Sequence, residues 1–214
     1  MKNHLIELLK DSSIDLDSSV FLESVAEDLL LYLTEWERWN AKINLTAESD
    51  ALSVANKHIY ESLQYVRAIS STGSLVDVGS GAGFPGIPVK IILPKLEIVL
   101  IESQRKRANF LKAAIHSIGL SKIQCVHGRA EDFPAFVGKY DFVTLRHVLE
   151  PHLSLQLGAT LLHPGGSLIL QTSCKNSFQF DFLDSLWLSP VDEIFFKRSG
   201  SSHSKIMVFK RNSS

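Results

Sequence analysis

Apolar residues in the first third of the chain recur every three or four positions, which is the spacing of one buried helix face. The pattern predicts a helix over residues 21–36 and a second helical stretch over 54–66, with a polar break between them. Ser18 or Ser19 is a candidate N-cap for the first helix, because a serine hydroxyl can accept a free backbone N–H. Residues 1–72 are therefore predicted to form a helical N-terminal extension.

From residue 73 onward, short apolar runs alternate with helical patterns. The predicted strands are residues 75–78, 97–101, 123–126, 142–144 and 167–171. The predicted helices are residues 85–92, 106–118, 149–161 and 178–186. Two further runs, 193–197 and 205–210, predict an antiparallel edge hairpin. Alternation of this kind is typical of an α/β domain with a parallel, doubly wound sheet, so residues 73–214 are predicted to form one.

Residues 77–84 form the most informative motif, in which an acidic residue and alternate glycines lie between a predicted strand and a predicted helix. The glycines are Gly79, Gly81 and Gly83. Glycine permits positive φ and lets a ligand touch the backbone, so the turn is typical of a nucleotide-cofactor loop. Asp77 would repel a pyrophosphate and attract the ammonium of a sulfonium amino acid, directly or through water, which favours S-adenosylmethionine over NAD. Residues 81–86 also match G-x-G-x-x-G, so NAD stays open.

Ligands of such sheets bind beyond the carboxyl ends of the strands, and polar residues follow three more predicted strands there. Glu102 lies about 20 residues beyond the glycine loop, the spacing of an acid that binds ribose hydroxyls, although it could instead cap the next helix. Glu131 or Asp132, with the backbone beside them, is predicted to bind the adenine amine, the alternative being a solvated helix start. Arg146 should abut the methyl donor, unless it forms a surface ion pair.

The charge is unevenly distributed, although the formal net charge is only −1. Residues 1–72 hold six Lys or Arg and twelve Asp or Glu, whereas residues 73–214 hold sixteen and eleven. A near-neutral chain is not a general polyanion binder, but its basic part allows a local RNA-binding patch. The candidate RNA-binding residues are Lys57, His58, Arg105, Lys106, Arg107, Arg146 and Lys175. The alternatives are solvated lysines and a hydrogen-bonded core position for His58.

Composition excludes several other classes of protein. The two cysteines, Cys125 and Cys174, form neither a disulfide framework nor a metal site. No apolar run approaches the roughly 18 residues of a membrane span, and residues 1–10 lack a signal-peptide pattern. We therefore expect a cytoplasmic protein without a metal. Cys174 follows the fifth predicted strand and could act as a nucleophile in carbon-5 methylation, the alternative being an ordinary thiol.

A set of short segments extends these motifs over nearly the whole chain. The segments are Trp39-Asn40, Asn44-Leu45-Thr46, Lys57-His58-Ile59, Glu61-Ser62-Leu63, residues 77–88, Glu102-Ser103, Lys106-Arg107, Phe110-Leu111, Arg129-Ala130-Glu131, Asp141 and Arg146. With them the sequence closely resembles the bacterial 16S ribosomal RNA guanine-N7 methyltransferases, the glucose-inhibited division protein B family. Two departures, His147 and the segment Ser173-Cys174-Lys175-Asn176, lie where the substrate should bind.

The resemblance implies a Rossmann-like class I S-adenosylmethionine-dependent methyltransferase with an N-terminal helical extension. It implies methyl transfer from S-adenosylmethionine to N7 of a guanine in small-subunit ribosomal RNA, as RNA or as the ribosomal subunit, by a protein expected to be a monomer. The cofactor positions of the family correspond here to Gly79, Phe84, Ala130, Glu131 and Arg146.

Guanine N7 carries an in-plane lone pair at neutral pH, so its methylation needs alignment and no general base. We therefore predict no acid–base catalytic residue, and a role for Arg146 in positioning cofactor or RNA. The product base is cationic, and a site that favours positive charge should help. Two alternatives stay open: a methyltransferase acting on a small molecule or protein, and a nucleotide-binding module without catalysis.

Overall fold

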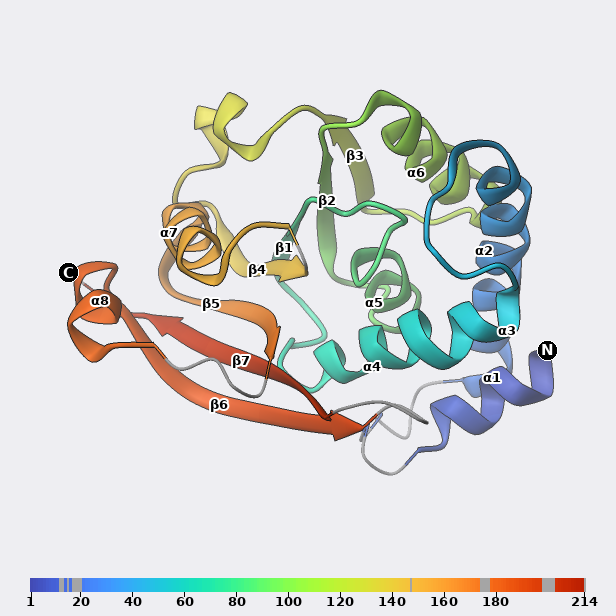
Figure 1. The fold of residues 1–214 in the computed structure, drawn as a ribbon, viewed down its shortest axis with the longest axis horizontal. Coiled ribbons are helices and arrows are strands. Elements are labelled where there is room, and N and C mark those ends of the chain that lie inside the picture. Colours follow the sequence, from blue (N-terminus) through green and yellow to red (C-terminus); the bar gives the residue numbers. More distant parts are fainter. Residues whose placement is uncertain are drawn as a thin grey trace.

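The computed structural model describes residues 1–11, 14, 16, 21–146, 148–173, 178–197 and 203–213. Its described part holds one seven-stranded sheet in the order β3-β2-β1-β4-β5-β7-β6 (Figure 1). The strands are β1 Ser74–Val78, β2 Glu97–Glu102, β3 Ile123–His127, β4 Tyr140–Arg146, β5 Leu162–Ser173, β6 Leu188–Lys197 and β7 His203–Arg211. Strands β1 to β5 are parallel, while β7 runs antiparallel to β5 and β6. The predicted parallel sheet with an antiparallel C-terminal hairpin is therefore confirmed.

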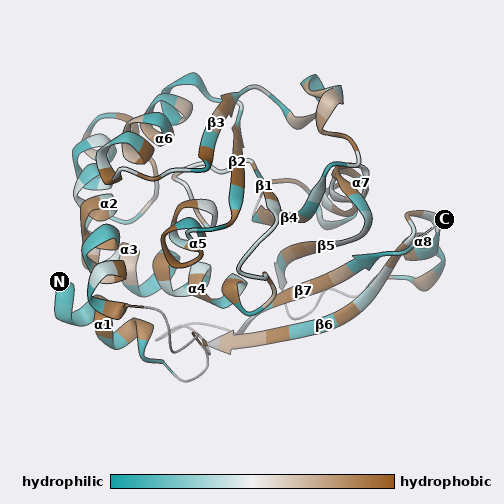
Figure 2. Ribbon diagram, turned by 180° about the vertical axis from the view of Figure 1, so that it is seen from behind, coloured by the Kyte–Doolittle hydropathy of each residue, from teal (hydrophilic) through white to brown (hydrophobic). Residues whose placement is uncertain are grey.

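Helices cover both faces of this sheet. Their bounds are α1 Lys2–Leu9, α2 Leu22–Ile43, α3 Ala51–Val54, α4 Tyr60–Val66, α5 Gly86–Ile92, α6 Arg105–Ile118, α7 Pro151–Leu161 and α8 Phe180–Ser185, with short turns η2 Ala130–Asp132 and η3 Pro134–Phe136. One hydrophobic cluster joins α1 to α6 with one face of the sheet, and a second joins α7 and α8 with the other face. The central strands between these layers are largely hydrophobic in Figure 2.

Several elements differ from the sequence-based prediction in their bounds: β6 begins at Leu188, five residues before the predicted start, and α2 continues to Ile43, beyond the predicted end at residue 36. Strand β5 begins at Leu162, five residues before the predicted start, because Leu162 already pairs with Tyr140 of β4. Helix α2 begins after Phe21, which occupies the N-cap position without a side-chain cap. Ser18 and Ser19, the predicted caps, lie outside the described residues.

The second predicted helical stretch contains a local change of winding. Helix α3 runs into the π-helical turn η1, Ala55–Ile59, and then into α4. Such turns are rare and interrupt the regular 3.6-residue spacing. Lys57 and His58, two of the predicted RNA-binding residues, lie within this turn.

The helices of residues 1–72 share their core with the rest of the chain. Buried residues of α2, such as Trp36, belong to the same hydrophobic cluster as Leu75 of β1 and Leu100 of β2. A domain boundary after residue 72 stays a prediction. In the described part of the chain, no helix has the combination of length and apolar character needed to cross a bilayer.

Candidate functional site

The glycine loop between β1 and α5 forms the centre of the candidate site. Gly79, Gly81 and Gly83 have φ of +67°, +58° and +90°, so all three occupy the region that favours glycine. The loop is fixed to the neighbouring strand because the Ser80 amide donates to the Ile101 carbonyl over 3.0 Å. At Gly79 an added Cβ would lie 2.6 Å from Cγ2 of Val148, so this position has no room for a side chain.

A cavity of about 250 Å³ opens on one side of the loop, over the carboxyl ends of β2 and β3. It is lined by Val78, Gly79, Ile101, Ser103, Gly128, Arg129, Ala130, Glu131, Val148, Leu149 and Leu157. The structure thus brings together three predicted cofactor positions that are distant in sequence, Gly79, Ala130 and Glu131. Ala130 is buried and Glu131 is exposed, which gives this first cavity an apolar wall and a polar rim.

Glu102 lies beside this cavity and is only 4% exposed. Its Oε2 accepts from the Gly81 amide over 2.8 Å, and its Oε1 accepts from the Gln104 amide over 2.7 Å. The carboxylate therefore braces the glycine loop against the start of α6. Gln104, not Glu102, occupies the N-cap position of α6. Ribose binding by Glu102 stays a prediction.

Asp77 lies beneath the loop and is 1% exposed. Its Oδ1 accepts a hydrogen bond from Thr144 Oγ1 over 2.8 Å. Burial raises the pKa of this carboxyl to about 6, although the bonds from Thr144 and Ser80 act in the opposite direction. Asp77 is not among the residues that line the cavities on either side of the loop. Its contact with an ammonium group stays a prediction.

The wild-type protein is expected to lose up to about 3 kcal/mol of stability relative to Asp77→Asn as the pH rises from 4 to 6. The pKa of Asp77 is 3.8 in the unfolded chain and about 6 in the folded state, so the folded state holds the proton more tightly. Urea denaturation of both proteins across this range provides the measurement. Asp181→Asn, at an exposed position of α8, is the control. Parallel curves for wild type and Asp77→Asn would contradict the expectation.

A second cavity, of about 300 Å³, lies on the other side of the loop. It is lined by Leu45, Thr46, Ala47, Glu48, Lys57, His58, Gly79, Ser80, Gly81, Ala82, Phe84, Arg107 and Arg146. The predicted cofactor residues Phe84 and Arg146 thus meet the predicted RNA-binding residues Lys57, His58 and Arg107. Residues from the helical part of the chain form one wall, and the glycine loop forms the opposite wall.

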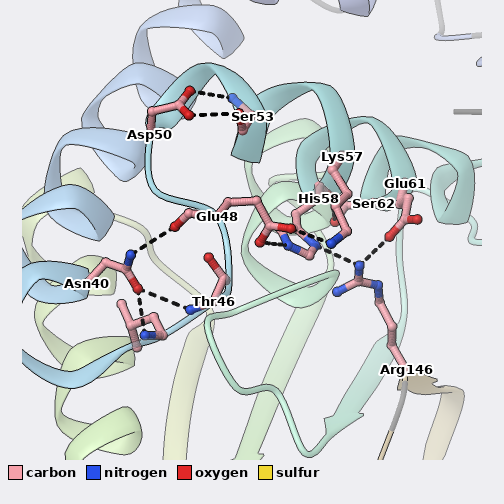
Figure 3. A network of polar contacts seen from close by, with 11 residues as sticks. Asn40, Thr46, Glu48, Asp50, Ser53, Lys57, His58, Glu61, Ser62 and Arg146 are labelled. Carbon is pink, nitrogen blue, oxygen red and sulfur yellow. Dashed lines mark hydrogen bonds and ion pairs between the residues drawn. The ribbon is translucent and has the colours of Figure 1, made fainter. Parts of the chain in front are cut away.

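Arg146, at the end of β4, is held by three side chains beside this cavity, and Figure 3 shows two of them, Glu61 and His58. Its Nη2 forms a buried ion pair with Glu61 of α4 and donates to His58 Nδ1 over 2.7 Å. Its Nε donates to Gln171 of β5 over 3.0 Å. The side chains of Arg146 and Glu61 are 10% and 0% exposed. Arg146 therefore forms an ion pair, as the alternative interpretation of the sequence allowed, but the pair is buried and does not lie on the surface.

His58 is likewise enclosed by its neighbours. Because a guanidinium can only donate, the ring must accept at Nδ1 and carry its proton on Nε2, which bonds Glu48 over 2.6 Å. The ring also stacks on Phe84, with 4.9 Å between centroids. Burial, assisted by the charge of Arg146, lowers the pKa of His58 to about 4. His58 is thus a hydrogen-bonded core histidine, and RNA contact by it stays a prediction.

Glu48 connects this network to the helical part of the chain. It forms an ion pair with Lys57 and accepts a hydrogen bond from His58 Nε2, and these contacts overcome the effect of burial and lower the pKa of Glu48 to about 2. Asn40 of α2 fixes the segment before it: its Oδ1 accepts from the amides of Leu45 and Thr46 over 2.7 and 3.1 Å. Its Nδ2 donates to the Glu48 carbonyl over 3.1 Å. Asn40 therefore fixes the backbone of residues 45–48.

The remaining predicted residues are less tied to the site. Arg105 and Lys106 are exposed at the start of α6. Lys175, together with His147 and Cys174, lies outside the described residues. Across the described residues, no group of three or more His, Cys, Asp or Glu side chains is placed to hold a metal ion. Sequence reasoning assigned no role to Glu48, Glu61 or Gln171. Glu61 and Gln171 are polar residues within apolar patterns, and Glu48 lies in the polar break between the two predicted helical stretches.

Comparison with known proteins places this geometry in a family. A match to rRNA small subunit methyltransferase G (GidB) covers residues 25–184. The chain is 42% identical over 137 residues to Ribosomal RNA small subunit methyltransferase G of Streptococcus gordonii, covering 61% of this chain and 58% of that protein. For the protein of the same name from Desulfitobacterium hafniense, the identity is 39% over 143 residues, covering 65% and 59%. The chain thus matches less than two thirds of the length of these relatives.

A solved structure, that of M. jannaschii TYW2 in complex with AdoMet, matches with a TM-score of 0.57 and 15% identity, covering 72% of this chain and 74% of that one. This likeness supports the Rossmann-like class I methyltransferase fold that the sequence predicts. The family match confirms the resemblance drawn from the motifs. The chain belongs to the family of rRNA small subunit methyltransferase G.

Proposed function

We propose that this protein transfers a methyl group from S-adenosylmethionine to N7 of a guanine in 16S ribosomal RNA. The observation that carries the proposal is the meeting of two cavities at the glycine loop, in a chain of this family. One cavity carries the cofactor positions Ala130 and Glu131, and the other carries Arg146. A donor lying across Gly79 would connect the two.

The residues of the first cavity fit the adenosine half of this donor. Ile101 and Leu157 offer an apolar wall to a base, and Glu131 offers an acceptor at the rim. Gly79, with its bare backbone, and Arg146 of the second cavity would hold the methionine half. When bound, S-adenosylmethionine supplies a methyl group activated by a sulfonium. The solved structure of M. jannaschii TYW2 in complex with AdoMet, which has a similar fold, supports this choice.

The second cavity suits a nucleophile that needs no deprotonation. Both ring nitrogens of His58 are engaged, and its lowered pKa keeps the ring neutral at neutral pH. Asp77, whose pKa is raised, does not line the cavity. Glu48, which does, is held as a carboxylate by Lys57 and His58, with its pKa lowered to about 2. Such an arrangement supports methylation at N7 of guanine, whose lone pair attacks directly. The residues align the reactants and exchange no proton.

RNA access rests on the basic residues at the start of α6, one of which lines the second cavity. Arg105 and Lys106 are exposed, and Arg107 lines the cavity. Small-subunit ribosomal RNA, free or within the subunit, is the proposed partner of a cytoplasmic monomer. The ion pairs of Lys57 with Glu48 and of Arg146 with Glu61 reduce the positive charge at this surface, and this observation favours the second candidate, a methyltransferase acting on a small molecule or protein.

Gly79→Ala is expected to weaken S-adenosylmethionine binding at least about tenfold and to lower RNA methylation accordingly. The added Cβ would meet Val148 at 2.6 Å and displace it within the first cavity, which Val148 lines. Gly165→Ala is the matched control, because Gly165 has a similar φ of +85° but open space around an added Cβ. Calorimetry with the donor gives both affinities. Equal losses in the two variants would show that backbone strain alone is responsible.

The reaction itself is tested with labelled donor and small-subunit RNA, followed by digestion and identification of the labelled nucleoside. The expected product is 7-methylguanosine. Label in another nucleoside would contradict the proposed position, and label only in protein or small molecules would favour the second candidate. Binding of NAD in place of S-adenosylmethionine would favour a nucleotide-binding module instead.

A further inference from the structure

The ion pair of Arg146 with Glu61 is the most deeply buried charge pair beside the glycine loop. Glu61 is fully buried, and it does not line either of the two cavities. Arg146 does line the second cavity. It also lies next to the loop in the sheet, because Leu145 is the register partner of Val78, one residue before Gly79. Among these residues, Arg146 is the one that connects Glu61 to the lining of the second cavity.

An arginine in this place presents an electrostatic problem for the proposed function. S-adenosylmethionine carries a positive sulfonium, and guanine methylated at N7 is a cation as well. A guanidinium close to both would repel them, and the repulsion is strong where water is excluded. The carboxylate of Glu61 lies against the guanidinium on its buried side and opposes its charge. Lys57, at the same cavity, is opposed in the same way by Glu48.

We propose that Glu61 is a positioning residue that holds Arg146 and neutralises its charge, so that the site accepts a cationic donor and a cationic product. The proposal rests on the proposed function for the identity of the donor. In this arrangement the guanidinium of Arg146 supplies hydrogen-bond donors to the site. The carboxylate of Glu61 compensates the positive charge that the guanidinium brings with it.

Binding of two related ligands tests the proposal. S-adenosylhomocysteine has the adenosine and amino-acid groups of S-adenosylmethionine but lacks the sulfonium charge. In Glu61→Gln, which keeps an acceptor of the same shape for Arg146, calorimetry should show about tenfold weaker binding of S-adenosylmethionine and a change within about twofold for S-adenosylhomocysteine, a selective loss of about 1.4 kcal/mol. Arg146→Gln should shift the ratio of the two affinities in the opposite direction, toward S-adenosylmethionine.

Two further variants separate charge from structure. Glu61→Asp keeps the charge and should restore the affinity ratio of the wild type. Glu35→Gln is the matched control, since Glu35 is a buried carboxylate of α2 that is paired with Arg38 away from both cavities, and it should leave the ratio unchanged. The double variant Glu61→Gln with Arg146→Gln removes both charges, so its ratio should return toward the wild-type value even if Glu61→Gln alone folds poorly.

A parallel fall of both affinities in Glu61→Gln, or a ratio in the double variant as disturbed as in the single one, would overturn the charge compensation. Wild-type protein that binds neither ligand would instead overturn the proposed function. An unchanged ratio in Glu61→Gln, with both ligands binding the wild type, would overturn this inference and leave the proposed function standing.

Discussion

Replacing Arg146 with methionine is expected to lower the free energy of unfolding by about 3–5 kcal/mol. The change leaves the carboxylate of Glu61 in the interior without its guanidinium, and Gln171 and His58 each lose a hydrogen bond. Removing one member of a buried pair costs more than the pair itself contributes, because the remaining charge has lost its hydration. Urea denaturation at neutral pH measures the loss.

Two comparisons make this result specific to the buried pair. Lys122→Met removes the partner of Glu97 in an ion pair whose side chains are 56% and 68% exposed, so its cost should stay below about 1 kcal/mol. Adding Glu61→Gln to Arg146→Met removes the stranded charge and should recover most of the stability. If Arg146→Met lowers the free energy of unfolding no more than Lys122→Met does, the pair of Arg146 with Glu61 is not buried in solution.

Acidification from pH 6.5 to pH 4 is expected to remove up to about 3 kcal/mol of stability from the wild type relative to His58→Gln. The pKa of His58 is 6.5 in the unfolded chain and about 4 in the folded state, so the unfolded chain binds the proton more tightly. The stability that neutral His58 contributes is present above pH 6.5 and is lost as the pH falls toward 4. The lowered pKa of Glu48 adds a further loss only below about pH 4.5.

The measurement is urea denaturation of both proteins at several pH values, with His116→Gln on the exposed face of α6 as the control. Asp77 has the opposite sign over nearly the same range, since its raised pKa makes acidification stabilising. The contributions of His58 and Asp77 should therefore largely cancel in the wild type between pH 6 and 4, and each single variant should expose one of the two slopes. A difference between wild type and His58→Gln that does not vary with pH would refute the burial of a neutral ring.

The fold could be predicted because its elements have regular spacing. Strands β1 to β4 and helices α5 to α7 all begin and end close to the positions that apolar runs indicate, and the positive φ of Gly79 agrees with the glycine pattern. The early start of β5 was missed because its first residues, including Gly165 and Gly166, do not resemble a strand in composition.

The candidate site was predicted only in part, because half of it depends on contacts between distant segments. Glycine and acidic residues after strands, Glu131 among them, give a local signal, whereas Ala130 followed from a resemblance. Nothing in the local sequence near Glu61 indicates an arginine 85 residues away. The π-helical turn that carries His58 is equally hidden, because one extra residue per turn leaves no mark in a short apolar pattern.

The bracing of residues 45–48 by Asn40 has a consequence for truncated and chimeric forms of this protein. A fragment that begins at residue 73 would retain the glycine loop and Arg146 yet lose the acidic and imidazole groups that surround that guanidinium. A chimera that joins residues 73–214 to a different N-terminal segment would therefore have an incomplete pocket. Residues 1–72 and the sheet must therefore be exchanged together if the site is to keep its chemistry.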